Sequence, residues 1–345
     1  MSQPINPNLA RLPVLKPEEY DLIRDIVLPY RTSVVGQDGG SQTTEFDDEC
    51  LEGAICYIGD VIPRRMFDPT NPDRLRRMLD VIRAIDEPIS AEKRRFRIEH
   101  NGVAFRAQVG QRPSGNDVTL RALPKETPHI NALHMPGAWR EYLLAQDHLN
   151  GGLIIVSGLN GNGKTTTVSA TLRSRLERFG GHANTCEDPI ELPLDGPWAG
   201  ADKSGYCAQR PADALDDPEK PGSGYGKSLY EVARQFPSFT GGGTILLIGE
   251  IRDEETALEA INAAEAGHLV LSTTHAPSAP AAIDRIVTLA CKRQGVDPQA
   301  IREQLARHLS AVFHQRLAYN SEANRAESAW WDRAVVRGEV LIKDE

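Results

Sequence analysis

Short apolar runs recur through the second half of the chain and are separated by segments with helical spacing. The runs occupy residues 152–157, 244–248 and 269–272. Strands of a parallel sheet have this continuous apolar composition, because helices bury both of their faces. Helices are expected over residues 139–149 and about 164–179. This pattern predicts an α/β domain in which helices cover both faces of a parallel sheet.

The first part of the chain has a different pattern. Apolar residues recur at helical spacing over residues 17–30 and again over 71–85, which predicts two amphipathic helices. From residue 96 to 123 apolar and polar residues alternate, as in β-strands, with a turn at residues 113–116. Helices and strands mixed in this way predict a small α+β domain.

Changes in composition divide the chain into two predicted domains. Residues 123–137 contain three prolines and little periodicity, which indicates a linker between residues 1–122 and residues 138–345. Residues 193–227 contain five prolines and six glycines. We interpret this stretch as a long loop without regular structure, which is either functional or a disordered surface insertion. A last strand is expected over residues 333–342.

Composition and charge limit the classes of partner. The chain has 345 residues and a formal net charge of −9, so no direct nucleic-acid partner is expected. Five cysteines without a CxxC pair argue against a disulfide framework or zinc module and favour a reducing cytosol. No apolar run approaches the ~20 residues of a membrane helix, and residues 1–11 lack a signal-peptide pattern. Association with a membrane is therefore expected only through partner proteins.

Residues 158–165, GLNGNGKT, match the phosphate-loop pattern GxxxxGK[ST] at every fixed position. Glycines let backbone N–H groups converge on phosphate oxygens, and the helix that follows directs its positive end at them. Lys164 would contact the β- and γ-phosphates, and Thr165 would offer its hydroxyl to Mg²⁺. The motif follows an apolar strand and opens a helix, which predicts a P-loop NTPase. The candidate nucleotide-binding residues are Gly158, Asn160, Gly161, Asn162, Gly163, Lys164, Thr165 and Thr166.

Two further segments can supply the carboxylates that a metal ion and an attacking water need near the γ-phosphate. The apolar run 244–248 leads to Glu250, an acid at the carboxyl end of a strand, as in a Walker B motif. Residues 187–191 carry three acids, which form either part of the site or a solvated acidic turn. His268 and His275 flank the third apolar run. They are either hydrogen-bonded structural residues or sensors of the γ-phosphate.

Together these segments resemble the ATPases of type II and type IV secretion machines, in particular the pilus-retraction (PilT-like) branch. The resemblance covers about residues 90–342. GLNGNGKTTT resembles the family's Walker A motif, CEDPIE its Asp box, and ILLIGEIRDEETALEAINAAEAGHLVLSTTHAPSAPAAIDRI its Walker B motif and His box. The resemblance implies an α/β fold, with a RecA-like P-loop NTPase domain preceded by a PAS-like α+β N-terminal domain. It implies that the chain hydrolyses ATP.

The resemblance also assigns expected roles to residues of the site. Glu191, the last acid of the Asp box, would be the general base that positions water. Glu250 would act with Mg²⁺ at the γ-phosphate, directly or through a water molecule. His268 and His275 would contact the γ-phosphate or another subunit, and Arg285 would contribute to the same network.

The N-terminal domain of this family places arginines on the nucleotide. The segment AFRAQVGQRPSGNDVTLRALP resembles that region, so Arg106, Arg112 and Arg121 are the candidates here. Guanidinium groups stabilise charge on a transferring phosphoryl group. The alternative is that these are ordinary exposed arginines of strands.

Assembly and location are implied by the same resemblance. Family members form homo-hexameric rings in which ATP turnover rotates the two domains and drives inner-membrane secretion or pilus platform proteins. The chain would thus be cytoplasmic and peripherally associated with the inner membrane.

Three features differ from the best-known branches. The absence of CxxC pairs disfavours the pilus-assembly branch, which carries a tetracysteine zinc module. The chain stops after the last expected strand, without the AIRNLI region of retraction ATPases, and residues 193–227 are longer than usual. These two features favour the DotB/TraJ-like group of type IVB secretion and conjugation.

Two other functions compete with an ATP-driven motor. The first is a nucleotide-binding ring scaffold that docks secretion partners with little turnover, against which Glu191 and Glu250 argue. The second is a small-molecule kinase, which the two histidines and the N-terminal domain fit poorly.

Overall fold

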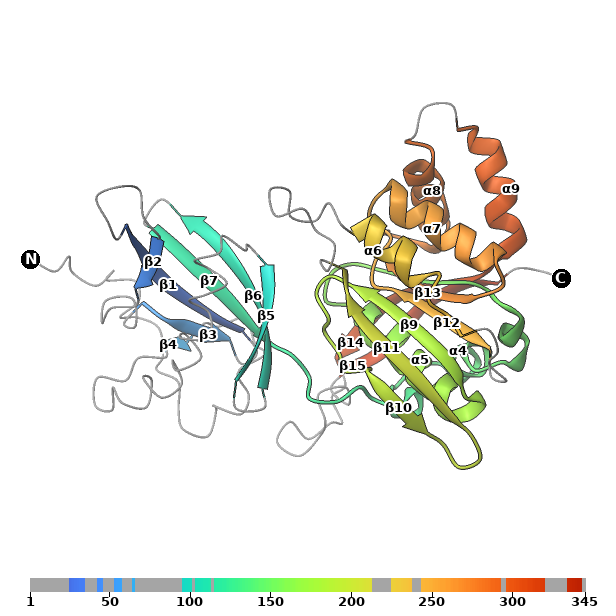
Figure 1. Cartoon of the computed structure of the whole chain (residues 1–345), viewed down its shortest axis with the longest axis horizontal. Coiled ribbons are helices and arrows are strands. Elements are labelled where there is room, and N and C mark those ends of the chain that lie inside the picture. The colour runs from blue at the N-terminus through green and yellow to red at the C-terminus, as the bar shows by residue number, and fades with distance from the viewer. Residues whose placement is uncertain are drawn as a thin grey trace, which may run out of the picture. The chain divides into compact units, whose positions relative to one another are not determined.

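The computed structural model (Figure 1) divides into two compact units, Met1–Lys125 and Glu126–Glu345, which are described separately. The division falls within residues 123–137, the segment predicted to link two domains. The structure describes residues 25–34, 42–45, 53–57, 64–65, 95–100, 103–112, 115–212, 225–237, 243–292, 296–319 and 334–342.

The first unit contains an antiparallel sheet. Its strands have the order β4-β3-β1-β7-β6-β5, and β2 pairs with β1. The strands predicted between residues 96 and 123 are confirmed, because β5, β6 and β7 cover most of this region. Arg112 of β6 pairs with Gly115 of β7, so the two strands form a tight hairpin, and Gly115 and Asn116 of the predicted turn belong to β7. The bounds are β1 Asp25–Val34, β2 Gln42–Glu45, β3 Ile55–Tyr57, β4 Arg64–Arg65, β5 Arg95–His100, β6 Val103–Arg112 and β7 Gly115–Ala122.

The helix predicted over residues 17–30 is wrong where the structure describes it, because β1 begins at Asp25. Ile26, Leu28 and Tyr30 are buried at alternate positions, the spacing of a strand with one face in the core. Pairing with β7 along most of this segment overrides the local helical spacing. The helix predicted over residues 71–85 lies outside the described residues.

The second unit contains an eight-stranded sheet of order β10-β11-β9-β12-β13-β8-β14-β15. The six central strands are parallel, and β10 and β15 pair antiparallel at the two edges. The predicted parallel sheet is thus confirmed, with antiparallel edges added. The strand bounds are β8 Gly152–Ser157, β9 Gly181–Glu187, β10 Gly196–Ala199, β11 Ser204–Pro211, β12 Thr244–Ile248, β13 Leu269–Thr274, β14 Leu309–Tyr319 and β15 Ala334–Ile342.

Helices cover both faces of this sheet. In Figure 1, α6, α7, α8 and α9 lie on one side and α4 and α5 on the other. Alternate residues of β8 join opposite apolar clusters: Leu153 and Ile155 face α7, whereas Ile154 and Val156 face α5. The continuous apolar run therefore reflects burial on two faces. The bounds are η3 Ile130–Ala132, α4 Gly137–Leu143, η4 Gln146–Asn150, α5 Lys164–Phe179, α6 Tyr225–Val232, α7 Glu254–Glu265, α8 Ala279–Ala290 and α9 Pro298–His308.

The structure corrects the interpretation of residues 193–227 as a loop without regular structure. β10 and β11 form a hairpin that extends the sheet beside β9, and α6 begins at Tyr225. Gly205 explains how β11 fits there, because a Cβ at this position would lie 2.7 Å from the side chain of Leu176 in α5. β11 also pairs with β9 across 24 residues, a contact that the local composition does not reveal. Residues 213–224 are outside the described part.

The helix predicted over residues 139–149 is divided into α4 and η4. The carbonyl of Tyr142 accepts bonds from Ala145 N and from His148 Nε2, both outside the α-helical ladder. These bonds satisfy the end of α4 and start a new turn. The expected last strand is confirmed as β15.

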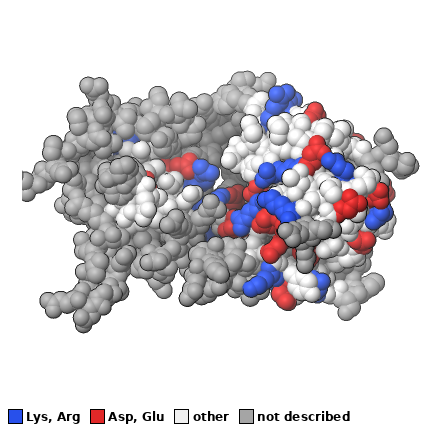
Figure 2. Space-filling view, turned by 90° about the horizontal axis from the view of Figure 1, so that it is seen from above, with Lys and Arg blue, Asp and Glu red and all other residues white. Residues whose placement is uncertain are grey.

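Charges of both signs are intermixed on the described surface of the second unit in the view of Figure 2. Some of them form ion pairs, such as Arg302 with Asp284 at 3.0 Å. Within the described residues, no helix combines the length and apolarity that crossing a bilayer requires.

Candidate active site

The predicted phosphate loop connects the carboxyl end of β8 to the first turn of α5. Gly161 and Gly163 have φ of 77° and 73°, in the left-handed region that favours glycine. Gly163 caps α5 without a side-chain bond. The first N–H groups of a 16-residue helix are thereby left for an anion, and the positive end of the helix lies at the loop.

Lys164 occupies the centre of the candidate site. Its side chain is buried, and its Nζ donates to the carbonyl of Leu159 at 3.0 Å. Nζ also lies 3.3 Å from Nδ1 of His275. Burial lowers the pKa of Lys164, and the charges of Glu250 and Glu191 oppose this effect. Both predicted catalytic carboxylates therefore lie close enough to act on this ammonium group.

His275 links Lys164 to Glu250. Its Nε2 lies 3.3 Å from Oε1 of Glu250, while Nδ1 faces the lysine. An ammonium donates and a carboxylate accepts, so the geometry fits a neutral ring protonated on Nε2. Glu250 follows β12 and His275 follows β13, which is its parallel neighbour. The carboxyl ends of adjacent strands thus bring the two side chains together.

Hydroxyl groups of β13 hold the backbone that carries Glu250. Ser272 Oγ and Thr273 Oγ1 donate to the carbonyls of Ile248 and Gly249, each at 2.7 Å. Thr274 Oγ1 donates to the carbonyl of Ile251, the residue after Glu250, at 3.2 Å. These bonds, two of them buried, limit the movement of the loop and so position its carboxylate.

The three acids of residues 187–191 have different surroundings. Glu187 is buried and accepts a bond from Gln209 Nε2 at 2.8 Å. Asp188 pairs with Arg252, also at 2.8 Å. Glu191 is half-buried and acts on the charge of Lys164. Separate partners thus offset the mutual repulsion of the acids.

His268 lies at the opposite end of β13 from the phosphate loop. Its Nδ1 contacts Thr244 Oγ1 at 2.6 Å, its ring stacks on Phe236 at 4.3 Å, and burial lowers its pKa. The six residues of β13 separate it from the loop end of the sheet, a distance of roughly 20 Å at the usual rise per residue. Within this chain, His268 is therefore not brought to the phosphate loop.

Arg285 lies on α8 and lines an open groove of about 460 Å³ together with His275. Its Nε is buried and makes no hydrogen bond within the described residues. The structure thus places Arg285 next to the candidate site, on the side of His275.

Two of the three predicted arginines of the first unit, Arg106 and Arg121, lie in one row across the sheet. Arg106 of β6 pairs directly with Arg121 of β7, and on the other side with Arg97 of β5. Arg121 Nε contacts Asp25 Oδ1 at 2.7 Å. Arg112 ends β6. Sequence reasoning missed Arg97, although its position between the buried Phe96 and Ile98 of β5 was a signal that it lies on the face opposite the core.

Gln315 of β14 is a second residue that sequence reasoning missed. Its buried side chain donates from Nε2 to the carbonyl of Asn162 at 2.6 Å and accepts at Oε1 from Thr167 at 2.8 Å. Asn162 Oδ1 in turn accepts from the amide of Leu317 at 3.2 Å. β14 thus supports the phosphate loop from behind. The segment LSAVFHQRL marked this region, but no pattern within it assigned a role to the glutamine.

We expect the substitution Gln315→Ala to loosen the phosphate loop. The buried hydroxyl of Thr167 and the partly buried carbonyl of Asn162 would lose their partner, which costs about 1–3 kcal/mol of unfolding free energy. Chemical denaturation measures this loss, and titration with a fluorescent ATP analogue should show weaker binding. Gln304→Ala is the matched control, because Gln304 bonds only to exposed Glu265 in the described structure. Equal stability and affinity in the two variants would contradict the expectation.

Comparison with protein families identifies one match over most of the chain. The model of the family "Type II/IV secretion system protein" matches residues 90–335. The uncharacterized protein YggR of Escherichia coli K12 is 33% identical over 61% of this chain and 57% of its own length. Type II secretion system protein E of Klebsiella pneumoniae is 35% identical over 66% and 41%. The type IV pilus retraction ATPase PilT of Pseudomonas aeruginosa is 30% identical over 64% and 58%. The chain thus spans about half the length of the curated relatives it matches.

Solved structures show the same relationship. The pilus retraction motor PilT with bound ADP has a TM-score of 0.62 and 25% identity, over 96% of this chain and 84% of that one. The ATPase DotB of Legionella pneumophila has a TM-score of 0.62 over 95% and 79%, and its 19% identity supports likeness of fold alone. From the family match and these relatives together, the chain belongs to the type II/IV secretion system protein family.

Proposed function

We propose that this protein is an ATPase that powers a type IV secretion or conjugation system, or type IV pilus dynamics. The observation that carries the proposal is the chain of contacts Lys164–His275–Glu250 at the end of the phosphate loop, with Glu191 acting on the same lysine. A phosphate cradle with two carboxylates beside it has the groups that hydrolysis of a γ-phosphate needs.

In this proposal each side chain has a separate task. Lys164 binds the β- and γ-phosphates together with the loop amides. Glu191 accepts the proton of the attacking water. Glu250 acts with Mg²⁺ at the γ-phosphate. His275, in contact with both Lys164 and Glu250, senses whether that phosphate is present.

Mg²⁺ fits the residues at this site. The hydroxyl of Thr165 and the carboxylate of Glu250 are oxygen donors, which this ion prefers, and nucleotide phosphates and water would complete its shell. The described residues hold no cluster of three or more His, Cys, Asp or Glu that would bind a metal without a nucleotide. Bound Mg²⁺ would neutralise charge that develops on the phosphates.

The first unit has the proposed role of completing the site. Its row of arginines, Arg97, Arg106 and Arg121, and Arg112 at the far end of β6 would bring positive charge to the nucleotide. The PAS-like character of this unit, the RecA-like character of the second and a division near residues 123–137 belong to the same proposal.

We also propose a homo-hexamer that acts on inner-membrane platform proteins from the cytoplasmic side. His268 would contribute to contacts between subunits, since it lies away from the phosphate loop. The likeness to PilT and to secretion protein E supports a motor role. The DotB/TraJ-like group is the proposed subclass.

The proposal is tested by phosphate release from the purified chain with ATP, with and without Mg²⁺, alongside mass measurement by light scattering. We expect Mg²⁺-dependent release and a nucleotide-stabilised hexamer. A folded hexamer that binds ATP without release above background would instead support the scaffold, and phosphate transfer to an added acceptor would support a kinase. A monomer at high protein and ATP concentrations would contradict the ring.

A further inference from the structure

One ion pair connects the two loops that carry Glu250 and Glu191. Arg252 Nη1 donates to Asp188 Oδ2 at 2.8 Å, across 64 residues of sequence. Arg252 follows Glu250 by two residues, and Asp188 precedes Glu191 by three. We infer that Arg252 is a positioning residue, which holds Asp188 and thereby sets the place of Glu191 relative to Glu250 and Lys164. The inference rests on the proposed ATPase function.

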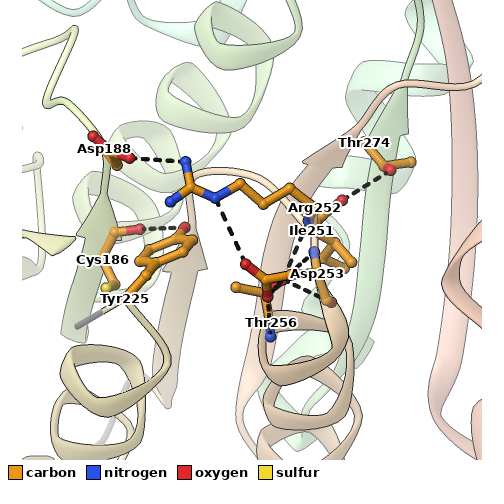
Figure 3. A network of polar contacts seen from close by, with 8 residues as sticks. All are labelled: Cys186, Asp188, Tyr225, Ile251, Arg252, Asp253, Thr256 and Thr274. Atoms are coloured by element: carbon orange, nitrogen blue, oxygen red, sulfur yellow. Dashed lines mark hydrogen bonds and ion pairs between the residues drawn. The ribbon is translucent and has the colours of Figure 1, made fainter. Parts of the chain in front are cut away.

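The backbone of Arg252 is held firmly at the start of α7 (Figure 3). Its amide donates to Thr256 Oγ1 at 3.2 Å. Asp253 caps the helix by accepting from Thr256 N at 2.9 Å, as part of a reciprocal capping box. On the other side, the carbonyl of Ile251 accepts from Thr274 Oγ1. The side chain of Arg252 therefore extends from a fixed backbone position toward the Asp box.

The guanidinium group is fixed in direction as well. It lies 4.5 Å above the ring of Tyr225, and Figure 3 shows this ring beside the arginine and below Asp188. Tyr225 is buried, and its hydroxyl donates to the carbonyl of Cys186 at 3.3 Å. The same ring thus contacts both the arginine and the strand end that leads into Asp188. Asp253 Oδ2, 3.7 Å from Nε, is a second acid near the group.

This geometry assigns the pair to positioning more than to stability. The two side chains are 27% and 23% exposed, and ion pairs in contact with water add little to the stability of a fold. By contrast, catalysis is sensitive to small displacements of a base, because its distance to the attacking water decides the rate. Burial alone would lower the pKa of Arg252, but the bond to Asp188 raises this pKa overall. Arg252 therefore keeps its positive charge in the pair with Asp188.

The experiment compares Arg252→Gln, Asp188→Asn and the double variant. A misplacement of about 1 Å costs on the order of a hundredfold, so we expect kcat for ATP to fall by about this factor in each. The Kd of a fluorescent ATP analogue should change by less than about threefold, because Lys164 and the loop amides remain. The double variant should lose no more than either single one, since one interaction is removed in all three. Arg252→Lys keeps the positive charge but lacks the planar guanidinium group with its several N–H donors. Its kcat should therefore lie between those of Arg252→Gln and the wild type.

A second measurement uses the protein without nucleotide. Hydrogen–deuterium exchange of peptides covering residues 187–192 should be faster in Arg252→Gln than in the wild type, with the 158–165 peptides unchanged. Arg302→Gln is the matched control, because it breaks an exposed arginine–aspartate pair at 3.0 Å on α9 and α8. It should change neither kcat nor exchange over 187–192.

These readouts separate the inference from the proposed function. If the wild type hydrolyses no ATP, the proposed function fails. Faster exchange over residues 187–192 in Arg252→Gln would still support the positioning role of Arg252. Unchanged exchange over 187–192 in a folded Arg252→Gln protein would overturn the inference, with or without a fall in kcat. Faster exchange throughout the second unit would also overturn it, because the arginine would then serve the fold as a whole.

Discussion

Replacing Lys164 with alanine is expected to lower ATP turnover by about 10²–10³-fold, the usual effect of removing one preorganised group that stabilises a transition state. The side chain contacts the loop carbonyl of Leu159 at 3.0 Å and Nδ1 of His275 at 3.3 Å, so the substitution removes the positive charge between these two groups. Nucleotide binding should weaken as well, because Lys164 would contact the phosphates before and during the reaction. Phosphate release and titration with a fluorescent ATP analogue measure the two effects.

The same substitution should leave the fold intact. Lys164 lies in the first turn of α5, where alanine is a good helix former, and most of the helix packs through other residues. We expect the unfolding free energy to change by less than about 2 kcal/mol. Lys203→Ala, at an exposed position before β11, is the control for the loss of a lysine. Normal turnover in a Lys164→Ala protein with a native circular dichroism spectrum would contradict the assigned role.

Glu191→Gln is expected to produce a protein that binds ATP but barely hydrolyses it. A general base contributes about 10²–10⁴-fold, and an amide of nearly the same shape cannot accept the proton of water. Affinity for ATP should be equal or higher, because the negative charge of Glu191, which is close enough to affect the pKa of Lys164, repels the phosphates. Glutamine removes this repulsion. Single-turnover hydrolysis measures the chemical step, and equilibrium titration measures the affinity.

Glu141→Gln provides the matched control, since Glu141 is an exposed residue of α4. It should retain the wild-type rate. Hydrolysis by Glu191→Gln within about threefold of the wild type, well inside the contribution of a general base, would remove Glu191 from that role. Glu250 would then be the carboxylate to test next, because it also acts on Lys164.

Prediction from sequence succeeded where a local pattern decides the structure. The strand at 152–157 and the helix at 164–179 have the expected bounds, since the apolar run, the glycines and the helix follow one another without a gap. It failed at β1 and at the β10–β11 hairpin, where pairing with β7 and β9 overrides local spacing and composition. The paired residues are 86–96 apart in the first case and 24 apart in the second, so neither pairing shows in a short window of sequence.

The candidate site shows the same division. Lys164, Glu250 and Glu191 belong to recognisable motifs, and the structure places them close together. Gln315 and Arg252 do not stand out, because a single glutamine or arginine acquires a role only from its partner. Their partners, Asn162 and Asp188, are 153 and 64 residues away.

The sequence by itself predicted a phosphate-binding loop over residues 158–165, because that motif lies in contiguous residues that need only a strand before them and a helix after them. The tertiary structure alone decided which side chains meet the loop. It brought His275 to Lys164 across 111 residues and left His268 at the far end of the same strand. The physical reason is that parallel strands gather their carboxyl ends at one edge of the sheet, and a strand of six residues keeps its two ends apart.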